Sequence, residues 1–507
     1  EHLIGLAGAG ASSGMAMAHW EIQGWMILIL GWVFVPFYSR SMVYTMPEFL
    51  ERRYNPQSRT ILSVISLVSY VLTKVAVTVY AGGLVFQQVF GIKELWGIDF
   101  FWIAAIGLVV LTALYTIFGG MKSVLYTSVL QTPILLLGSL IILVLGFKEL
   151  GGWDEMMRVC GAVTVNDYGD TMTNLIRSND DANFPWLGAL IGSAIIGFWY
   201  WCTDQFIVQR VLSGKNEKEA RRGTIFGAYL KLLPVFLFLI PGMIAFALHQ
   251  KYIGAGGEGF LPMLANGTAN ADAAFPTLVA KLLPAGVKGL VVCGILAALM
   301  SSLASLFNSS AMLFTIDFYK RFRPETPEKK LVGIGQIATV VIVILGILWI
   351  PIMRSVGDVL YTYLQDVQSV LAPGIAAAFL LGICWKRTSA QGGMWGLIAG
   401  MIIGLTRLGA KVYYSNAGEV ADSTFKYLFY DMNWLFFCGW MFLFCIIVVI
   451  VVSLATEAPT AEKIQGLVFG TATKEQKAAT RASWDHWDII HTVIILAITG
   501  AFYWYFW

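Results

Sequence analysis

The chain of 507 residues has little charge and few of the residues that bind transition metals. Only 13% of it is Asp, Glu, Lys or Arg, against about 25% in soluble domains. A soluble protein of this length would need far more charge to cover its surface. The six cysteines form no CxxC pair and the five histidines show no metal-ligand spacing. The net charge of +3 is too small to indicate a nucleic-acid partner.

Hydrophobic residues take the place of the missing charge. They make up 57% of the chain, aromatic residues make up 14%, and the mean hydropathy is +0.70. This aliphatic and aromatic content excludes a disordered chain. The 51 glycines show no triplet period, which excludes a collagen-like chain. The composition is typical of a polytopic membrane protein.

Apolar stretches long enough to cross ~30 Å of hydrocarbon recur along the chain, and we expect about twelve spans. They lie near 20–39, 61–90, 99–118, 124–147, 185–209, 223–248, 285–318, 331–353, 359–385, 391–410, 433–455 and 488–507. The earlier run from Leu3 to Ala18 is too short to span alone, so we expect further residues upstream of Glu1. Lys and Arg concentrate in alternate short loops, which places the 40–60 loop in the cytoplasm.

Polar side chains occur inside these predicted spans, where they cost several kcal/mol unless they are paired or solvated. The main candidates are Glu21, Lys74, Asp204, Lys231 and Gln365. By default such residues mark a transport pathway. Lys74 and Asp204 have an alternative reading as halves of structural ion pairs, with Arg210 as a candidate partner for Asp204.

Hydrogen-bonding groups recur beside aromatic residues on four different spans. They are Glu21, Tyr200 with Trp201, Lys231, and Tyr361 with Gln365. A sugar needs this mixture, because its hydroxyls require polar partners and its C–H face stacks on an aromatic ring. A buried site built for hydroxyls also rejects analogues that lack them. The hydroxyl-rich run LMSSLASLFNSS suits a hard cation such as Na⁺, although its serines could simply allow close helix packing.

Glycine and alanine alternate through 5–14, which predicts a broken or closely packed segment, and Gly192 and Gly197 precede the aromatic triplet 199–201. Discontinuous helices at corresponding positions of two halves indicate a transporter binding site. Counting spans, we expect a first inverted repeat at 1–147 and a second at 185–385. The outer loop 148–184 separates them, and the peripheral C-terminal helices 386–507 follow.

Long motifs add to this argument: GLAGAGASSGMA, TMPEFLERRY, WYWCTDQFIVQR, YLKLLP and LMSSLASLFNS. With them the chain resembles the sodium/solute symporter family, most of all its sodium/glucose (galactose) cotransporters. The likeness covers most of the chain and is weakest after about residue 411. It implies an all-α fold with a LeuT-like five-plus-five inverted-repeat core and additional peripheral helices.

The resemblance also implies roles for individual residues. It implies sugar contacts at His2, Glu21, Tyr200, Trp201, Lys231 and Gln365. It implies an inner gate at Tyr200 and outer gates at Trp20 and Tyr361. It implies Na⁺ ligands at the carbonyl of Ala298 and the hydroxyls of Ser301 and Ser302, with the remaining ligands upstream of Glu1.

Three positions depart from the family pattern. Ser128 stands where members with a second Na⁺ carry Asp, and Ala304 stands where they carry Thr. We therefore expect one Na⁺ per sugar. Gly197 lacks the hydroxyl-type contact that the family makes with the sugar from the helix break. This absence leaves room there for water or a different substituent.

Together these observations predict Na⁺-coupled symport of a hexose such as glucose or galactose across the plasma (inner) membrane by alternating access. We expect Na⁺ as the co-transported ion and no organic cofactor. The expected partners are a sugar, Na⁺ and the lipid bilayer, without nucleic acid, and a homo-oligomer is left open. The alternatives are symport of another solute (myo-inositol, a nucleoside, sialic acid) and a Na⁺-permeable channel or sensor. We expect no enzyme, because the sequence shows no nucleophile–base pair, phosphate loop or metal cluster.

Overall fold

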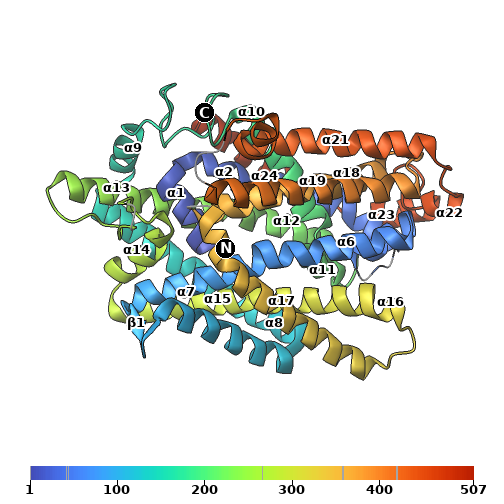
Figure 1. Cartoon of the computed structure of the whole chain (residues 1–507), viewed down its shortest axis with the longest axis horizontal. Coiled ribbons are helices and arrows are strands. Elements are labelled where there is room, and N and C mark those ends of the chain that lie inside the picture. Colours follow the sequence, from blue (N-terminus) through green and yellow to red (C-terminus); the bar gives the residue numbers. More distant parts are fainter. Residues whose placement is uncertain (1, 42, 44, 265–266, 357–358, 418–420) are drawn as a thin grey trace.

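The protein is built almost entirely from helices (Figure 1). The computed structural model describes residues 2–507 except 42, 44, 265–266, 357–358 and 418–420. Within that part of the chain the sheet content is one hairpin, formed by β1 (Glu94–Leu95) and β2 (Ile98–Asp99). Eleven helical stretches of the described residues are long and apolar enough to cross a membrane. The chain is therefore an all-α polytopic membrane protein.

The first 90 residues form a series of interrupted helices, in which η marks short π or 3-10 segments. They are η1 (His2–Leu6), α1 (Ala7–Ser13), η2 (Gly14–Met17), α2 (Ala18–Glu21), α3 (Gly24–Ile29), η3 (Leu30–Phe34), α4 (Val35–Ser41), α5 (Met46–Arg53), α6 (Pro56–Ser69), η4 (Tyr70–Val75) and α7 (Ala76–Phe90). Thr45 and Asn55 cap α5 and α6 by accepting backbone N–H groups. Each cap is followed by a proline in the first helical turn, a typical start signal.

The predicted spans 99–118 and 124–147 are wrong in one respect. They join in one continuous helix, α8 (Phe100–Leu150), with no loop between them. The segment between them contains Gly119 and Gly120 but no proline, so every backbone N–H can continue the helical hydrogen bonding. The side chain of Ser128 lies outside the described residues.

The middle of the chain contains the predicted outer loops and the second set of spans. Its elements are α9 (Trp153–Gly161), α10 (Trp186–Gly197), η5 (Phe198–Thr203), α11 (Gln205–Leu212), α12 (Glu217–Pro234), η6 (Val235–Leu239), α13 (Ile240–Gly254), η7 (Ala271–Ala273), α14 (Ala274–Leu282), α15 (Ala285–Met312), η8 (Leu313–Tyr319), α16 (Lys320–Phe322), α17 (Glu328–Val356) and α18 (Leu360–Cys384).

The remaining elements complete the bundle. They are α19 (Ala390–Asn416), α20 (Thr424–Lys426), η9 (Tyr427–Asp431), α21 (Trp434–Ala455), α22 (Ala461–Ile464), α23 (Lys474–Ala482) and α24 (His486–Tyr505). Helices α18, α19 and α21 pack together along one side of the molecule (Figure 1). Figure 1 also shows α9, α14 and β1 at one end and α16, α22 and α23 at the other. Loops predicted for the same side of the membrane therefore lie at the same end.

The predicted close packing of the opening segment is confirmed. A Cβ atom at Gly10 would lie 2.2 Å from the carbonyl oxygen of Leu239, and one at Gly242 would lie 2.0 Å from that of Ala7. Only glycine permits backbones to approach this closely. Helix α1 is thereby pressed against η6 and α13, and this contact holds the residues that follow α1 in the middle of the bundle.

Candidate substrate and cation site

Glu21 is the centre of the buried polar residues. Its side chain is fully buried at the end of α2. Lys231 Nζ donates to Glu21 Oε2 at 2.6 Å, and the Tyr361 hydroxyl donates to Oε1. His2 Nε2 lies 3.3 Å from Glu21 Oε1. Residues from three separate candidate spans therefore converge on one carboxylate, and the ammonium of Lys231 compensates its buried charge.

A small cavity of about 30 Å³ lies beside this cluster. Its lining includes most of the predicted sugar-site and gate residues: His2, Trp20, Tyr200, Trp201, Lys231, Tyr361 and Gln365. This volume has room for only a few water molecules. A sugar can therefore enter only if the lining side chains move apart.

The α18 wall of the cavity is a single helical stripe. Leu364 and Gln365 lie three and four residues after Tyr361 and four and three residues before Gln368, so the four side chains share one helix face and line the cavity together. Gln365 Oε1 is buried and has no hydrogen-bond partner among the described residues. Gln368 did not enter the sequence prediction, although its position one turn after Gln365 is a usable signal.

The predicted break in the 185–209 span is present. Helix α10 ends at Gly197, the aromatic residues form the π segment η5, and Asp204 adopts an extended conformation with ψ 127° before α11 begins. Within η5, the Trp201 ring lies 5.4 Å from Lys231 Nζ, a cation–π contact. The break therefore places Trp201 against the polar cluster.

Lys74 and Asp204, the residue that directly follows η5, form a buried ion pair. Asp204 Oδ1 also accepts the Tyr70 hydroxyl at 3.0 Å, and Lys74 Nζ lies 4.9 Å from the centre of the Tyr200 ring. Arg210, the partner considered for Asp204, donates instead to Ser305 at 2.7 Å. That pairing was wrong because a side chain that reaches across from a neighbouring helix cannot be found from sequence spacing.

Aromatic residues pack against Trp20, which lines the cavity. The ring of Trp20 stacks on Trp434 with a centroid distance of 5.4 Å and contacts Phe184 edge-on at 6.1 Å. Sequence reasoning missed Trp434 and Phe184, since a tryptophan at the start of a span is typical of a membrane interface. The structure brings Trp20 and Tyr361 to the cavity, and their gating roles stay predictions.

The predicted Na⁺ ligands lie on α15, outside the cavity lining. Ala298, Ser301 and Ser302 are half-buried, and their spacing places them on one face of the helix. Further along α15, Ser305 accepts from Arg210 and Ser309 accepts from Gln209 Nε2 at 2.6 Å. Because Gln209 and Arg210 belong to α11, the serine-rich helix is bonded to the segment that follows η5.

Asp272, in the predicted outer loop that precedes α15, forms hydrogen bonds with the start of α18. Its carboxylate accepts the backbone N–H of Leu360, at 3.1 Å to Oδ2 and 3.2 Å to Oδ1. It also packs on α1, because a Cβ atom at Gly8 would lie 2.5 Å from Asp272 Oδ1. Burial raises the pKa of Asp272 to about 7, against the lowering effect of the Leu360 hydrogen bond. This residue therefore holds the helix end that carries Tyr361.

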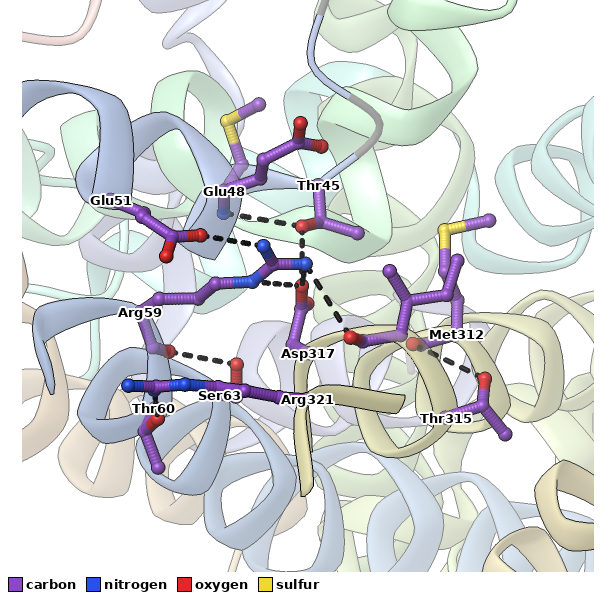
Figure 2. A network of polar contacts seen from close by, with 12 residues as sticks. Thr45, Glu48, Glu51, Arg59, Thr60, Ser63, Met312, Thr315, Asp317 and Arg321 are labelled. Carbon is purple, nitrogen blue, oxygen red and sulfur yellow. Dashed lines mark hydrogen bonds and ion pairs between the residues drawn. The ribbon is translucent and has the colours of Figure 1, made fainter. Parts of the chain in front are cut away.

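The segment 45–60 joins two helix ends at the opposite side of the molecule. Arg59 donates to Glu51 Oε2 at 2.6 Å and to Asp317 Oδ1 at 2.8 Å, and Thr45 also donates to Asp317 (Figure 2). Arg53 donates to the carbonyls of Gly382, Trp385 and Thr388 at the end of α18. The TMPEFLERRY motif thus connects the helical stretch that contains α15 and η8 with the helix that carries Gln365.

These features define the class of protein: a multi-pass membrane carrier with a broken helix and a small cavity between its spans that buried polar side chains line. The chain belongs to the sodium:solute symporter family, whose profile matches residues 1–400. The predicted family is therefore confirmed, and the family transports solutes.

Individual relatives are similar over nearly the whole chain. The sodium/myo-inositol cotransporter 2 of Homo sapiens is 36% identical over 483 residues, which cover 93% of this chain and 70% of that protein. The sodium/glucose cotransporter 1 of Ovis aries is 37% identical over 474 residues, which cover 90% of this chain and 70% of that protein.

A solved structure, described as the substrate-bound outward-open state of a Na⁺-coupled sialic acid symporter, has the same fold. Its TM-score is 0.66 at 19% identity, with 90% of this chain and 87% of that chain covered. This likeness concerns the fold alone. The roles of the site residues and the domain limits 1–147, 148–184, 185–385 and 386–507 stay predictions.

Proposed function

We propose that the protein carries a neutral hexose or polyol together with one Na⁺ across the plasma membrane by alternating access. The observation that supports this most is that Lys231, Tyr361 and Gln365 line one cavity, with the buried carboxylate of Glu21 directly behind Lys231 and Tyr361. In this structure Lys231 and Tyr361 bond to Glu21. A polyhydroxylated solute replaces those bonds, because its hydroxyls donate to Glu21 and accept from Lys231.

The charge of the cluster favours a neutral substrate. The carboxylate of Glu21 is balanced by the ammonium of Lys231 at 2.6 Å. An anionic solute such as sialic acid would bring a charge into the cavity that the Glu21–Lys231 pair leaves without a counter-ion. Hydroxyl groups instead exchange hydrogen bonds without adding charge, and the Trp201 ring offers a face for the C–H side of a sugar.

Myo-inositol is the second candidate. It is a neutral cyclic polyol, and the relatives include sodium/myo-inositol cotransporters at 36% identity. At one ring position inositol has a C–OH group, whereas a hexose has a ring oxygen. Inositol therefore offers a hydroxyl donor at that position and a hexose does not. Competition between galactose, glucose and inositol at the same site decides the preference.

We further propose that Na⁺ binds to α15 at Ala298, Ser301 and Ser302 and drives the cycle. The bonds of Ser305 to Arg210 and Ser309 to Gln209 offer a physical route from α15 to the Tyr200 gate through α11. Cation and solute then raise each other's affinity by the same factor. The membrane potential adds about 2.3 kcal/mol per charge per 100 mV.

The test is uptake into proteoliposomes that contain the purified protein. Labelled galactose, glucose or myo-inositol should accumulate with an inward Na⁺ gradient and stay at the background level with an inward K⁺ gradient. Equal uptake in both gradients would contradict symport. Na⁺ current without accumulation of any of the three solutes would identify a channel instead.

A further inference from the structure

Gln23 is a further glutamine on the cavity wall. It lies between α2 and α3, is 2% exposed, and lines the same cavity as Lys231 and Gln365. On an unbroken helix its side chain would point away from that of Glu21, two residues earlier. The helix is interrupted here, with ψ 11° at Ile22 and ψ 30° at Gln23, and the interruption turns Gln23 to the cavity.

The orientation of the Gln23 amide is set by a backbone carbonyl. Gln23 Nε2 donates to the carbonyl oxygen of Ser193 in α10 at 2.8 Å. A carbonyl can only accept, so the nitrogen of the amide must face it. The amide oxygen Oε1 therefore points along α10 toward Gly197. Gln23 therefore presents its oxygen Oε1 as an acceptor near Gly197, while its nitrogen Nε2 donates to Ser193.

Gly197 makes this arrangement possible. A Cβ atom at position 197 would lie 2.3 Å from Gln23 Oε1 and 3.1 Å from Gln23 Cδ. Any side chain at position 197 would therefore displace the amide. The amide of Gln23, from the segment between α2 and α3, occupies the space that a side chain at position 197 would fill. The identities of residues 23 and 197 are thus coupled.

We propose that Gln23 is a specificity-determining substrate ligand whose amide oxygen accepts a hydrogen bond from one hydroxyl of the polyol. The inference deepens the proposed function and rests on it. Gln23 Oε1 and Gln365 Oε1 offer neutral acceptors from different helices, and Lys231 offers the donor. A hydroxyl that bonds to Gln23 must act as a donor, which a fluorine substituent cannot do.

The test compares wild-type protein with Gln23→Ala on a set of monodeoxyfluoro sugars, one for each hydroxyl of the preferred hexose. Inhibition of labelled-sugar uptake gives the apparent affinity of each analogue. In the wild type, fluorine at the hydroxyl facing Gln23 should weaken binding by about tenfold. In Gln23→Ala this penalty should disappear, while the penalties at the other hydroxyls remain.

Gly197→Ala is the second variant, and it leaves Gln23 in the chain. The added methyl group should push the amide away and remove the same penalty. The double variant Gln23→Ala/Gly197→Ala should show no further loss of selectivity, because both changes remove one interaction. Gln368→Ala is the matched control, since Gln368 is another of the three amides on the cavity wall and its loss should leave the penalty attributed to Gln23 in place.

Two results would overturn the inference: a full set of fluorine penalties in Gln23→Ala, or an equal loss of affinity for every analogue. The second result would indicate a purely structural role for the bond to Ser193. Failure of the proposed function has a different signature, in which the wild type itself accumulates no hexose or inositol in a Na⁺ gradient, and the inference then fails with it.

Discussion

Lys231 donates to the carboxylate of Glu21 at 2.6 Å, although 210 positions separate the two residues in the chain. The pair joins α12 to the end of α2, and neither partner is exposed enough for water to replace the other. Removing one member leaves a buried charge without compensation, which costs far more than the net value of the pair. Lys231 lines the cavity in which we expect the sugar to bind, and Glu21 lies directly behind it.

Changing Glu21→Gln or Lys231→Met should therefore reduce sugar uptake strongly, with an apparent affinity about 10- to 100-fold weaker. Each single variant should also lower the thermal stability of the purified protein, because the remaining charge stays buried. The double variant should recover much of that stability without recovering transport. A double variant as unstable as the singles would contradict the assignment of the lost stability to unpaired charge.

The Lys74–Asp204 pair should be important for the fold around the break between α10 and α11. Lys74→Met removes the partner of a buried carboxylate, which is expected to cost about 3–5 kcal/mol. We expect a clearly lower unfolding temperature in detergent and looser packing of the Tyr200 ring. Arg158→Met is the control, because its partner Glu155 lies at the surface and its own side chain is 69% exposed. If the two changes lowered the unfolding temperature equally, the buried pair would contribute no more to stability than an exposed one.

The predicted cation site should be separable from the sugar site. Ser301→Ala and Ser302→Ala should raise the Na⁺ concentration for half-maximal uptake by about tenfold. The affinity for sugar at saturating Na⁺ should change little. Ser310→Ala is the control, because this buried serine lies on the same helix, α15, and is not a predicted ligand. Unchanged Na⁺ dependence in both test variants would place the cation elsewhere.

Asp272 should make stability depend on pH. Its pKa is raised from 3.8 to about 7, so the folded state binds a proton more tightly than the unfolded chain does. The neutral carboxyl stabilises the fold fully below pH about 4, and this contribution is lost as the pH rises through about 7. Asp272→Asn removes the charge at every pH. It should raise the unfolding temperature relative to wild type at pH 8, and by less at pH 5.

The control for this prediction is Asp180→Asn, which changes an exposed carboxylate in the other outer loop. Its effect on the unfolding temperature should be small and similar at both pH values. A stability difference between Asp272→Asn and the wild type that is the same at pH 5 and pH 8 would contradict the raised pKa.

Much of the fold and part of the site could be predicted from the sequence. Hydrophobic length and the placement of Lys and Arg predict the spans, because the bilayer sets a minimum apolar length. Glu21, Lys231 and Gln365 stand out, since polar groups at membrane depth are expensive and must be paired. That Lys231 and Gln365 line one cavity, and that Glu21 bonds to Lys231 beside it, is visible only in three dimensions.

The features that could not be predicted depend on side-chain reach and on local breaks. Gln23 was missed because its spacing from Glu21 would place it on the opposite side of a regular helix. Asp204 was matched with Arg210, which is near in sequence, but Lys74 reaches it from another helix. Helix α8 continues where two spans were expected, because two glycines without a proline do not stop a helix on their own.

The most direct test of the account measures the fluxes of ²²Na⁺ and labelled sugar in the same proteoliposomes. The account predicts that each solute stimulates the uptake of the other, with about one Na⁺ entering per sugar, and that Glu21→Gln weakens both stimulations together. If sugar uptake is indifferent to Na⁺, and Na⁺ entry is indifferent to sugar, the two sites are not coupled and the central claim is wrong.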